Sequence, residues 1–340
     1  MLNAWRRWIT MYATDAALNL APRLSSSTVD RLGALVARIG PHTPVISRLV
    51  AENMRALGLY SPAAHRDYFA QVAEHFTGAL HVLRCAARVS GPSEELTRRV
   101  TECIEVDDSL YTLREAVQPN RGAVIVGPHI ANFLFSLARL HHVTPMTIYM
   151  RYSKHAGRRA AKERWCRANN MAWLVEPPSV AQTTGRLAAL VAAVRAGCTL
   201  FITPDMPRKR GDGTPVQFLG REIYLPAGAT VLAVRTGAPL FFLSAQVLPG
   251  GRQKLFLEGP APLEADDGVP DRARAVVQRQ LQWYADRFAR FVREQTPLWY
   301  SWGDKRWTRV CHGDPRYVGN LPTAEQADRT PAPTHVAGAR

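Results

Sequence analysis

From residue 122 onward, short apolar runs alternate with longer segments of helical periodicity, and this alternation restricts the fold more than any other feature of the sequence. Strands joined by helices build α/β sheets with helices on their faces. The expected strands are 123–126, 147–150, 172–175, 199–203, 240–246 and 254–258. The expected helices are 130–142, 155–169, 181–196, 227–236 and 270–295.

The chain before this alternation has a different texture. Residues 1–115 are expected to form successive helices, with helical periodicity over 29–38, 43–57 and 62–87. The sequence therefore predicts an N-terminal helical region over 1–115, an α/β core over 116–310 and a mobile tail over 311–340. Residues 204–222 contain Pro, Gly, Arg and Lys without periodicity, and predict a long loop.

Charge restricts the class of partner. The 340 residues include 43 Lys and Arg against 28 Asp and Glu, a net charge of +15, and 46% are hydrophobic. Such a chain can bury a core, so a fully disordered polymer is excluded, and the charge predicts an acidic partner. Five cysteines, an odd number without metal-ligand spacing, favour a reducing, cytoplasmic compartment and no metal site.

The N-terminus bears on membrane association. Arg6, Arg7 and Asp15 interrupt its apolar residues, so no transmembrane helix is expected. Aromatic and apolar residues recur there at nearly helical spacing, at Trp5, Trp8, Ile9 and Tyr12. Two interpretations stay open: a helix lying in a lipid interface, or an ordinary amphipathic helix packed on the domain.

One histidine occupies a position typical of functional residues. The segment GAVIVGPHIANF, residues 122–133, predicts a buried strand, a Gly-Pro turn and a helix that opens near His129. Ligands of α/β sheets bind at strand ends. The positive end of a helix dipole disfavours imidazolium, which would keep His129 available as a neutral base. The alternative is a histidine that only caps or packs the turn.

Six blocks together carry a family resemblance. They are NMRALG from Asn53, GAVIVGPHIANF, IYMR ending at Arg151, the segment around Asp205, PVQFLGREIYLPAG from Pro215, and PLWYSWGDKRW ending at Trp307. In this order the sequence resembles, over about residues 30–307, the lysophospholipid acyltransferase superfamily, and within it the late (lauroyl/myristoyl) lipid A acyltransferases and their phosphatidylinositol-mannoside relatives. The resemblance implies a glycerolphosphate-acyltransferase-like mixed α/β sheet flanked by helices, with an N-terminal helical region.

The family's catalytic motif is incomplete here. The resemblance implies a dyad H-x4-D/E, in which the carboxylate orients the histidine. His129 matches, Asn132 matches the Asn usual in the lipid A branch, and Leu134 occupies the position of the acid. Three explanations remain: Glu115 or Asp205 reaches His129 from another element, the reaction needs no carboxylate, or the protein binds without turnover.

The resemblance also implies the reaction. An acyl group would pass from a thioester donor, acyl-carrier protein or acyl-CoA, to a hydroxyl or amine, with His129 as general base and no tightly bound cofactor. Two alternatives are a diverged member acting on intermediates bound to acyl or peptidyl carrier proteins in nonribosomal peptide or polyketide biosynthesis, and a non-catalytic carrier- or lipid-binding protein.

Basic residues are candidates for holding the acidic donor. Seven cations lie within residues 151–167, and positions 151, 154, 158 and 162 share a face if the segment is helical. The candidates for donor binding are Arg151, Arg158, Arg159, Arg164, Arg208 and Arg221. The resemblance places Arg221 in a turn that lines the substrate tunnel. It places Asp205 in an acceptor- or phosphate-handling block, and a simple turn cap is the alternative.

The C-terminal block combines rings and cations. Its members are Trp299, Tyr300, Trp302, Lys305, Arg306 and Trp307. This mixture suits a membrane interface or single-stranded nucleic acid, and the resemblance favours packing or membrane. Because no nucleic-acid-binding signature is present, nucleic acid is not an expected partner. An anionic membrane surface, on the inner face of the cell membrane, is a further expected partner.

Overall fold

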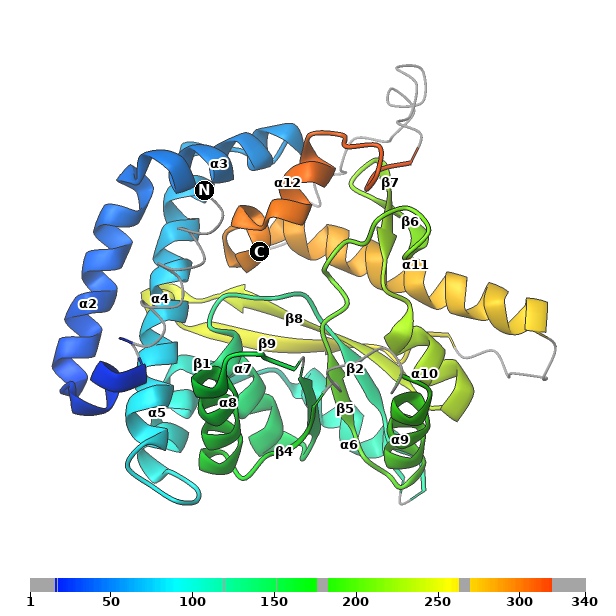
Figure 1. Cartoon of the computed structure of the whole chain (residues 1–340), viewed down its shortest axis with the longest axis horizontal. Coiled ribbons are helices and arrows are strands. Elements are labelled where there is room, and N and C mark those ends of the chain that lie inside the picture. The colour runs from blue at the N-terminus through cyan, green and yellow to red at the C-terminus, as the bar shows by residue number, and fades with distance from the viewer. Residues whose placement is uncertain are drawn as a thin grey trace, which may run out of the picture.

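A mixed seven-stranded sheet forms the centre of the molecule (Figure 1). The computed structural model describes residues 16, 18–118, 120–150, 152–175, 183–262 and 270–319. The strand order is β1-β9-β8-β2-β5-β3-β4, and all neighbours are parallel except β8 and β9. The strands are β1 (Ile104–Val106), β2 (Val124–Val126), β3 (Thr147–Met150), β4 (Ala172–Val175), β5 (Leu200–Ile202), β8 (Leu240–Val247) and β9 (Gln253–Glu258).

Helices cover the sheet, as the alternation predicts, so the expected mixed α/β fold is confirmed. In the core these are α7 (Phe133–Val143), α8 (Ala156–Ala168), α9 (Thr183–Arg195), α10 (Gly228–Thr236) and α11 (Pro270–Glu294). The N-terminal region contributes α2 (Ser26–Ile39), α3 (Pro44–Ala56), α4 (Pro62–Ala86) and α5 (Glu94–Cys103). Figure 1 shows α2, α3 and α4 together at one side of the sheet. In the described part of the chain, no helix is long and apolar enough to cross a membrane.

Local sequence signals set where the N-terminal helices begin. The hydroxyl of Ser25 accepts a hydrogen bond from the Thr28 amide (3.1 Å), and that of Ser61 accepts one from the Ala64 amide (3.0 Å). Such serine caps satisfy backbone donors that the first helical turn leaves unpaired. The N-terminal region is not wholly helical, because β1 lies within it and pairs with β9.

The expected loop over 204–222 is wrong in its second half. Residues Thr214–Phe218 form β6 and Arg221–Leu225 form β7, an antiparallel hairpin. Leu219 and Gly220 turn the chain with φ of 49° and 75°, the pair of positive angles that a two-residue hairpin needs. A leucine rarely adopts such an angle, so the turn gave no recognisable signal.

Part of the expected tail belongs to the folded body. Helix α12 (Lys305–Cys311) leads into a segment whose Tyr317 and Val318 are buried. Val318 pairs with Ile223, and the Gly319 amide donates to the Glu222 carbonyl at 2.9 Å. The segment therefore packs on the β6–β7 hairpin. Residues 320–340 lie outside the described residues, as does the N-terminal segment with Trp5, Trp8, Ile9 and Tyr12.

The tryptophans of the C-terminal block are core residues. Trp299, Trp302 and Trp307 are each 0% exposed, and the ring centroids of Trp299 and Trp307 are 4.7 Å apart. A buried ring cannot settle among lipid headgroups, so for these three residues the packing interpretation is correct and the interface interpretation is wrong.

Candidate catalytic site

His129 lies in the turn between β2 and α7, at the carboxyl end of a central strand. The turn leaves little room for a side chain at its start, because a Cβ on Gly127 would lie 3.0 Å from the Leu243 carbonyl oxygen of β8. Two backbone hydrogen bonds join the turn to the C-terminal segment: the Ala131 amide donates to Leu298 (2.7 Å) and the Tyr300 amide donates to His129 (2.9 Å). These two hydrogen bonds hold the backbone at His129 and Ala131, and so fix where the imidazole leaves the chain.

The carboxylate of Asp205 holds the imidazole. One carboxylate oxygen accepts a hydrogen bond from the His129 amide (2.9 Å), and the other lies 2.6 Å from Nδ1 of the ring. The Asp205 side chain is fully buried, whereas 34% of the His129 side chain is exposed. A carboxylate accepts hydrogen bonds, so in a neutral His129 this contact favours the tautomer with its proton on Nδ1 and a lone pair on Nε2.

Sheet topology explains this contact between residues 76 positions apart. Strands β2 and β5 are parallel neighbours, with Val126 opposite Ile202, and Asp205 follows β5 as His129 follows β2. Carboxyl ends of parallel strands meet at one edge of a sheet. The Asp205 carbonyl also accepts a hydrogen bond from the indole of Trp307 (2.9 Å), which ties the Asp205 loop to α12.

Position 134 is a leucine and has no carboxylate, and Glu115 does not contact His129. Leu134 is the second residue of α7 and packs against the core, and Glu115 is exposed on the short helix α6 (Thr112–Ala116). Of the two acids considered from the sequence, Asp205 is the one that reaches the imidazole.

The pKa of His129 is raised, contrary to the helix-dipole expectation. Burial acts to lower this pKa, but the charge of Asp205 and its hydrogen bond outweigh burial, with Asp304 adding to the rise and Arg306 opposing it. Helix α7 begins only at Phe133, four residues after His129, so the expected effect of its dipole on the ring does not hold.

Asn132 shapes the turn from the other end. Its φ of 56° is a left-handed conformation that asparagine tolerates better than most residues. Among the described residues its Oδ1 has no hydrogen-bond partner, and a Cβ on Gly78 of α4 would lie 2.4 Å from that oxygen. Asn132 therefore lies where the turn meets α4.

Further side chains surround the imidazole. The Phe133 ring stacks on the His129 ring with centroids 5.4 Å apart. His75 of α4 lies against Tyr300, with ring centroids 4.4 Å apart, and Arg306 of α12 contacts the sulfur of Met206. Sequence reasoning missed His75, because nothing in a helix pattern shows that α4 reaches the carboxyl ends of the strands.

Three of the predicted donor-binding residues, Arg158, Arg159 and Arg164, lie on α8. Arg151 lies outside the described residues. Helix α8 begins at Ala156, so the predicted helical face does not extend back to position 154. Arg159 donates to the carbonyls of Ser153 and Lys154, Arg164 donates to the Ala160 carbonyl, and Arg158 is exposed.

Arg208 and Arg221 differ in their surroundings. Arg208 is exposed after the Asp205 turn. Arg221 donates to the carbonyls of Val310 and Cys311 (both 2.9 Å) and of Ala56 (2.8 Å). Its guanidinium therefore joins the C-terminal ends of α12 and α3, where a cation also suits the helix dipole.

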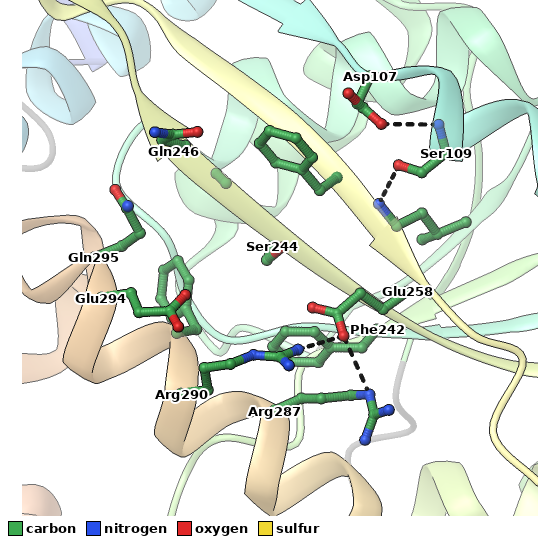
Figure 2. Close-up of a pocket in the computed structure, with 14 residues that line it drawn as sticks. Asp107, Ser109, Phe242, Ser244, Gln246, Glu258, Arg287, Arg290, Glu294 and Gln295 are labelled. Carbon is green, nitrogen blue, oxygen red and sulfur yellow. Dashed lines mark hydrogen bonds and ion pairs between the residues drawn. The ribbon is translucent and has the colours of Figure 1, made fainter. Parts of the chain in front are cut away.

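A cavity of about 450 Å³ lies elsewhere, between α11 and strands β8 and β9 (Figure 2). Phe242, Phe256 and Phe291 provide apolar walls, and Glu258 forms ion pairs with Arg287 and Arg290. The described residues that line it include neither His129 nor Asp205. The cavity and the histidine site are separate features.

No group of three or more potential metal ligands occurs in the part of the chain that the structure describes. The five cysteines are free. The local chemistry of the histidine site is that of an imidazole, a carboxylate and neighbouring polar side chains.

Comparison with known proteins agrees with the resemblance seen in the sequence. No curated protein matches the chain. The profile of the family described as "Bacterial lipid A biosynthesis acyltransferase" matches residues 1–309, which include both members of the His129–Asp205 pair. The chain belongs to the bacterial lipid A biosynthesis acyltransferase family.

Proposed function

We propose that this protein transfers an acyl group from a thioester donor, acyl-carrier protein or acyl-CoA, to a hydroxyl or amine acceptor, with His129 as general base. The contact between His129 and the buried Asp205 is the observation that carries the proposal. The carboxylate holds the Nδ1–H tautomer and stabilises the imidazolium that forms, the role of the acid in His-carboxylate pairs.

The reaction divides into two steps. His129 Nε2 takes the proton of the acceptor hydroxyl while the oxygen bonds to the thioester carbon, whose carbonyl electrons move onto the carbonyl oxygen. The intermediate then collapses, the C–S bond breaks, and the leaving thiolate receives the proton from His129. Asp205 remains ionised throughout.

Arginines on α8 and after Asp205 support an acidic donor. Arg158, Arg159 and Arg164 lie on α8, Arg208 is exposed beyond Asp205, and guanidinium groups match phosphate geometry. In this proposal the carrier protein or the phosphates of CoA dock at these arginines, and an anionic membrane presents a lipid A precursor as acceptor.

Transfer assays test the proposal. The protein is incubated with acyl-CoA or acyl-carrier protein of different chain lengths and a lipid A precursor with free hydroxyls, and acylated product is measured by mass spectrometry. We expect product with the parent chain and at least a 1,000-fold slower reaction with His129→Ala, on the order of the loss from removing a catalytic base. Equal rates for the two proteins would contradict the proposal. Glu115→Gln, which changes an acid away from His129, is the matched control.

A further inference from the structure

A second histidine of the site has no role in the reaction just described. His75 lies on α4, and its Nδ1 is fully buried without a hydrogen-bond partner among the described residues. Its ring lies against Tyr300, whose amide donates to the His129 carbonyl. The Tyr300 carbonyl in turn accepts a hydrogen bond from Tyr68 of α4 at 3.1 Å. Tyr300 therefore connects α4 to the His129 turn. His75 lies beside Tyr300.

His75 is a neutral imidazole at physiological pH. Burial, and to a smaller extent the nearby charge of a protonated His129, lower its pKa to about 4. A neutral imidazole carries one N–H. Leaving a buried N–H unpaired is rarer in proteins than leaving an acceptor unpaired, so the unpartnered Nδ1 is the bare nitrogen. The proton then resides on Nε2, and the side chain keeps partial exposure.

We propose that His75 is a catalytic residue whose Nε2–H donates a hydrogen bond to the carbonyl oxygen of the thioester as that oxygen becomes negatively charged. This inference rests on the proposed acyl transfer. As the acceptor oxygen bonds to the thioester carbon, the carbonyl electrons move to the oxygen. His75 stabilises that oxygen without giving up its proton, and the hydrogen bond weakens again when the C–S bond breaks.

Two substitutions separate hydrogen bonding from packing. His75→Phe keeps an aromatic ring against Tyr300 but removes the donor, and His75→Gln replaces the Nε2–H with an amide N–H at a similar reach. We expect kcat to fall about 100-fold in His75→Phe, the usual loss of one oxyanion donor, with KM for the donor within about threefold. We expect His75→Gln to recover at least a tenth of the parent kcat.

His142→Phe is the matched control. His142 also has a buried, unpartnered Nδ1 among the described residues and a pKa lowered by burial, but it lies at the far end of α7 from His129. Its substitution should leave kcat within threefold. A kcat of His75→Phe within threefold of the parent, or equal losses in His75→Phe and His75→Gln, would overturn the proposal.

A measurement independent of activity covers the case of a poorly folded variant. In the full chain with ¹⁵N-labelled histidine, the His75 ring should show the neutral Nε2–H tautomer at pH 6 to 8 and no titration there. A His75 ring protonated at pH 6, or carrying its proton on Nδ1, would overturn the proposal. Loss of activity in His129→Ala together with full activity in His75→Phe would reject this inference alone, whereas full activity in His129→Ala would reject the proposed acyl transfer.

Discussion

At the scale of the residue, His129 has Asp205 as its carboxylate partner, and Leu134 stands at the position where the proposed motif H-x4-D/E would have its acid. The motif that the resemblance implies has its acid five residues after the histidine, whereas Asp205 follows β5, the strand that pairs with β2. The residue types were visible in the sequence, and Asp205 was one of two candidates. Which of the two acids contacts His129 could not be predicted, because that depends on which strands are neighbours in the sheet.

The raised pKa of His129 predicts the pH dependence of transfer. In the proposed mechanism His129 must be neutral to accept a proton, so kcat should fall as the pH drops through a value above the ordinary 6.5 of histidine, and level off at higher pH. The same shift adds stability that is complete below pH 6.5 and is lost as the pH rises through the raised pKa. A pH–rate profile with its acid limb below 6.5 would contradict the assignment.

At the scale of the element, the contact between α4 and the His129 turn is tight. A methyl group at Gly78 would lie 2.4 Å from Asn132 Oδ1, so the Asn132 side chain, the turn or α4 must shift to admit it. We expect Gly78→Ala to lower kcat at least tenfold and to reduce the free energy of unfolding by about 1–3 kcal/mol. Gly91→Ala, where the added methyl meets nothing within 4 Å, is the control for both measurements.

We expect a substitution of Arg221 to change the stability of the protein but not its affinity for the donor. Its three hydrogen bonds join two helix ends, so Arg221→Met should lower the free energy of unfolding in urea by about 3 kcal/mol, with KM for the donor little changed. Arg208 is exposed, so Arg208→Met should raise KM for the donor and leave the free energy of unfolding little changed. An unchanged stability in Arg221→Met would show that these contacts are unimportant in solution.

Helices and strands whose apolar residues recur at a clear helical or strand spacing could be predicted from the sequence. Elements without such a spacing could not. The strands in the α/β part and the long helices follow from apolar patterning to within a few residues. The β6–β7 hairpin was missed because Leu219-Gly220 is not a familiar turn pair, and the packed segment after α12 was missed because its polar composition resembles a tail. Both errors come from tertiary contacts overriding local signals.

At the scale of the whole molecule, the net charge of +15 favours an acidic donor. If the donor docks electrostatically, KM for an acyl-carrier protein should rise at least fivefold between about 50 and 500 mM salt, because ions screen exposed charges. A neutral thioester, such as an acyl N-acetylcysteamine, should show no such rise. Equal salt dependence of both donors would contradict docking through the arginines of α8 and Arg208.

The substitution Asp205→Asn tests most directly whether Asp205 replaces the missing acid of the family motif. Asparagine keeps the size of the side chain and removes the charge that raises the pKa of His129. The account predicts a loss of roughly 10⁴ in kcat, as for the equivalent change in the serine-protease triad, in a protein that remains folded. A folded Asp205→Asn variant that transfers acyl groups within tenfold of the parent rate would contradict it.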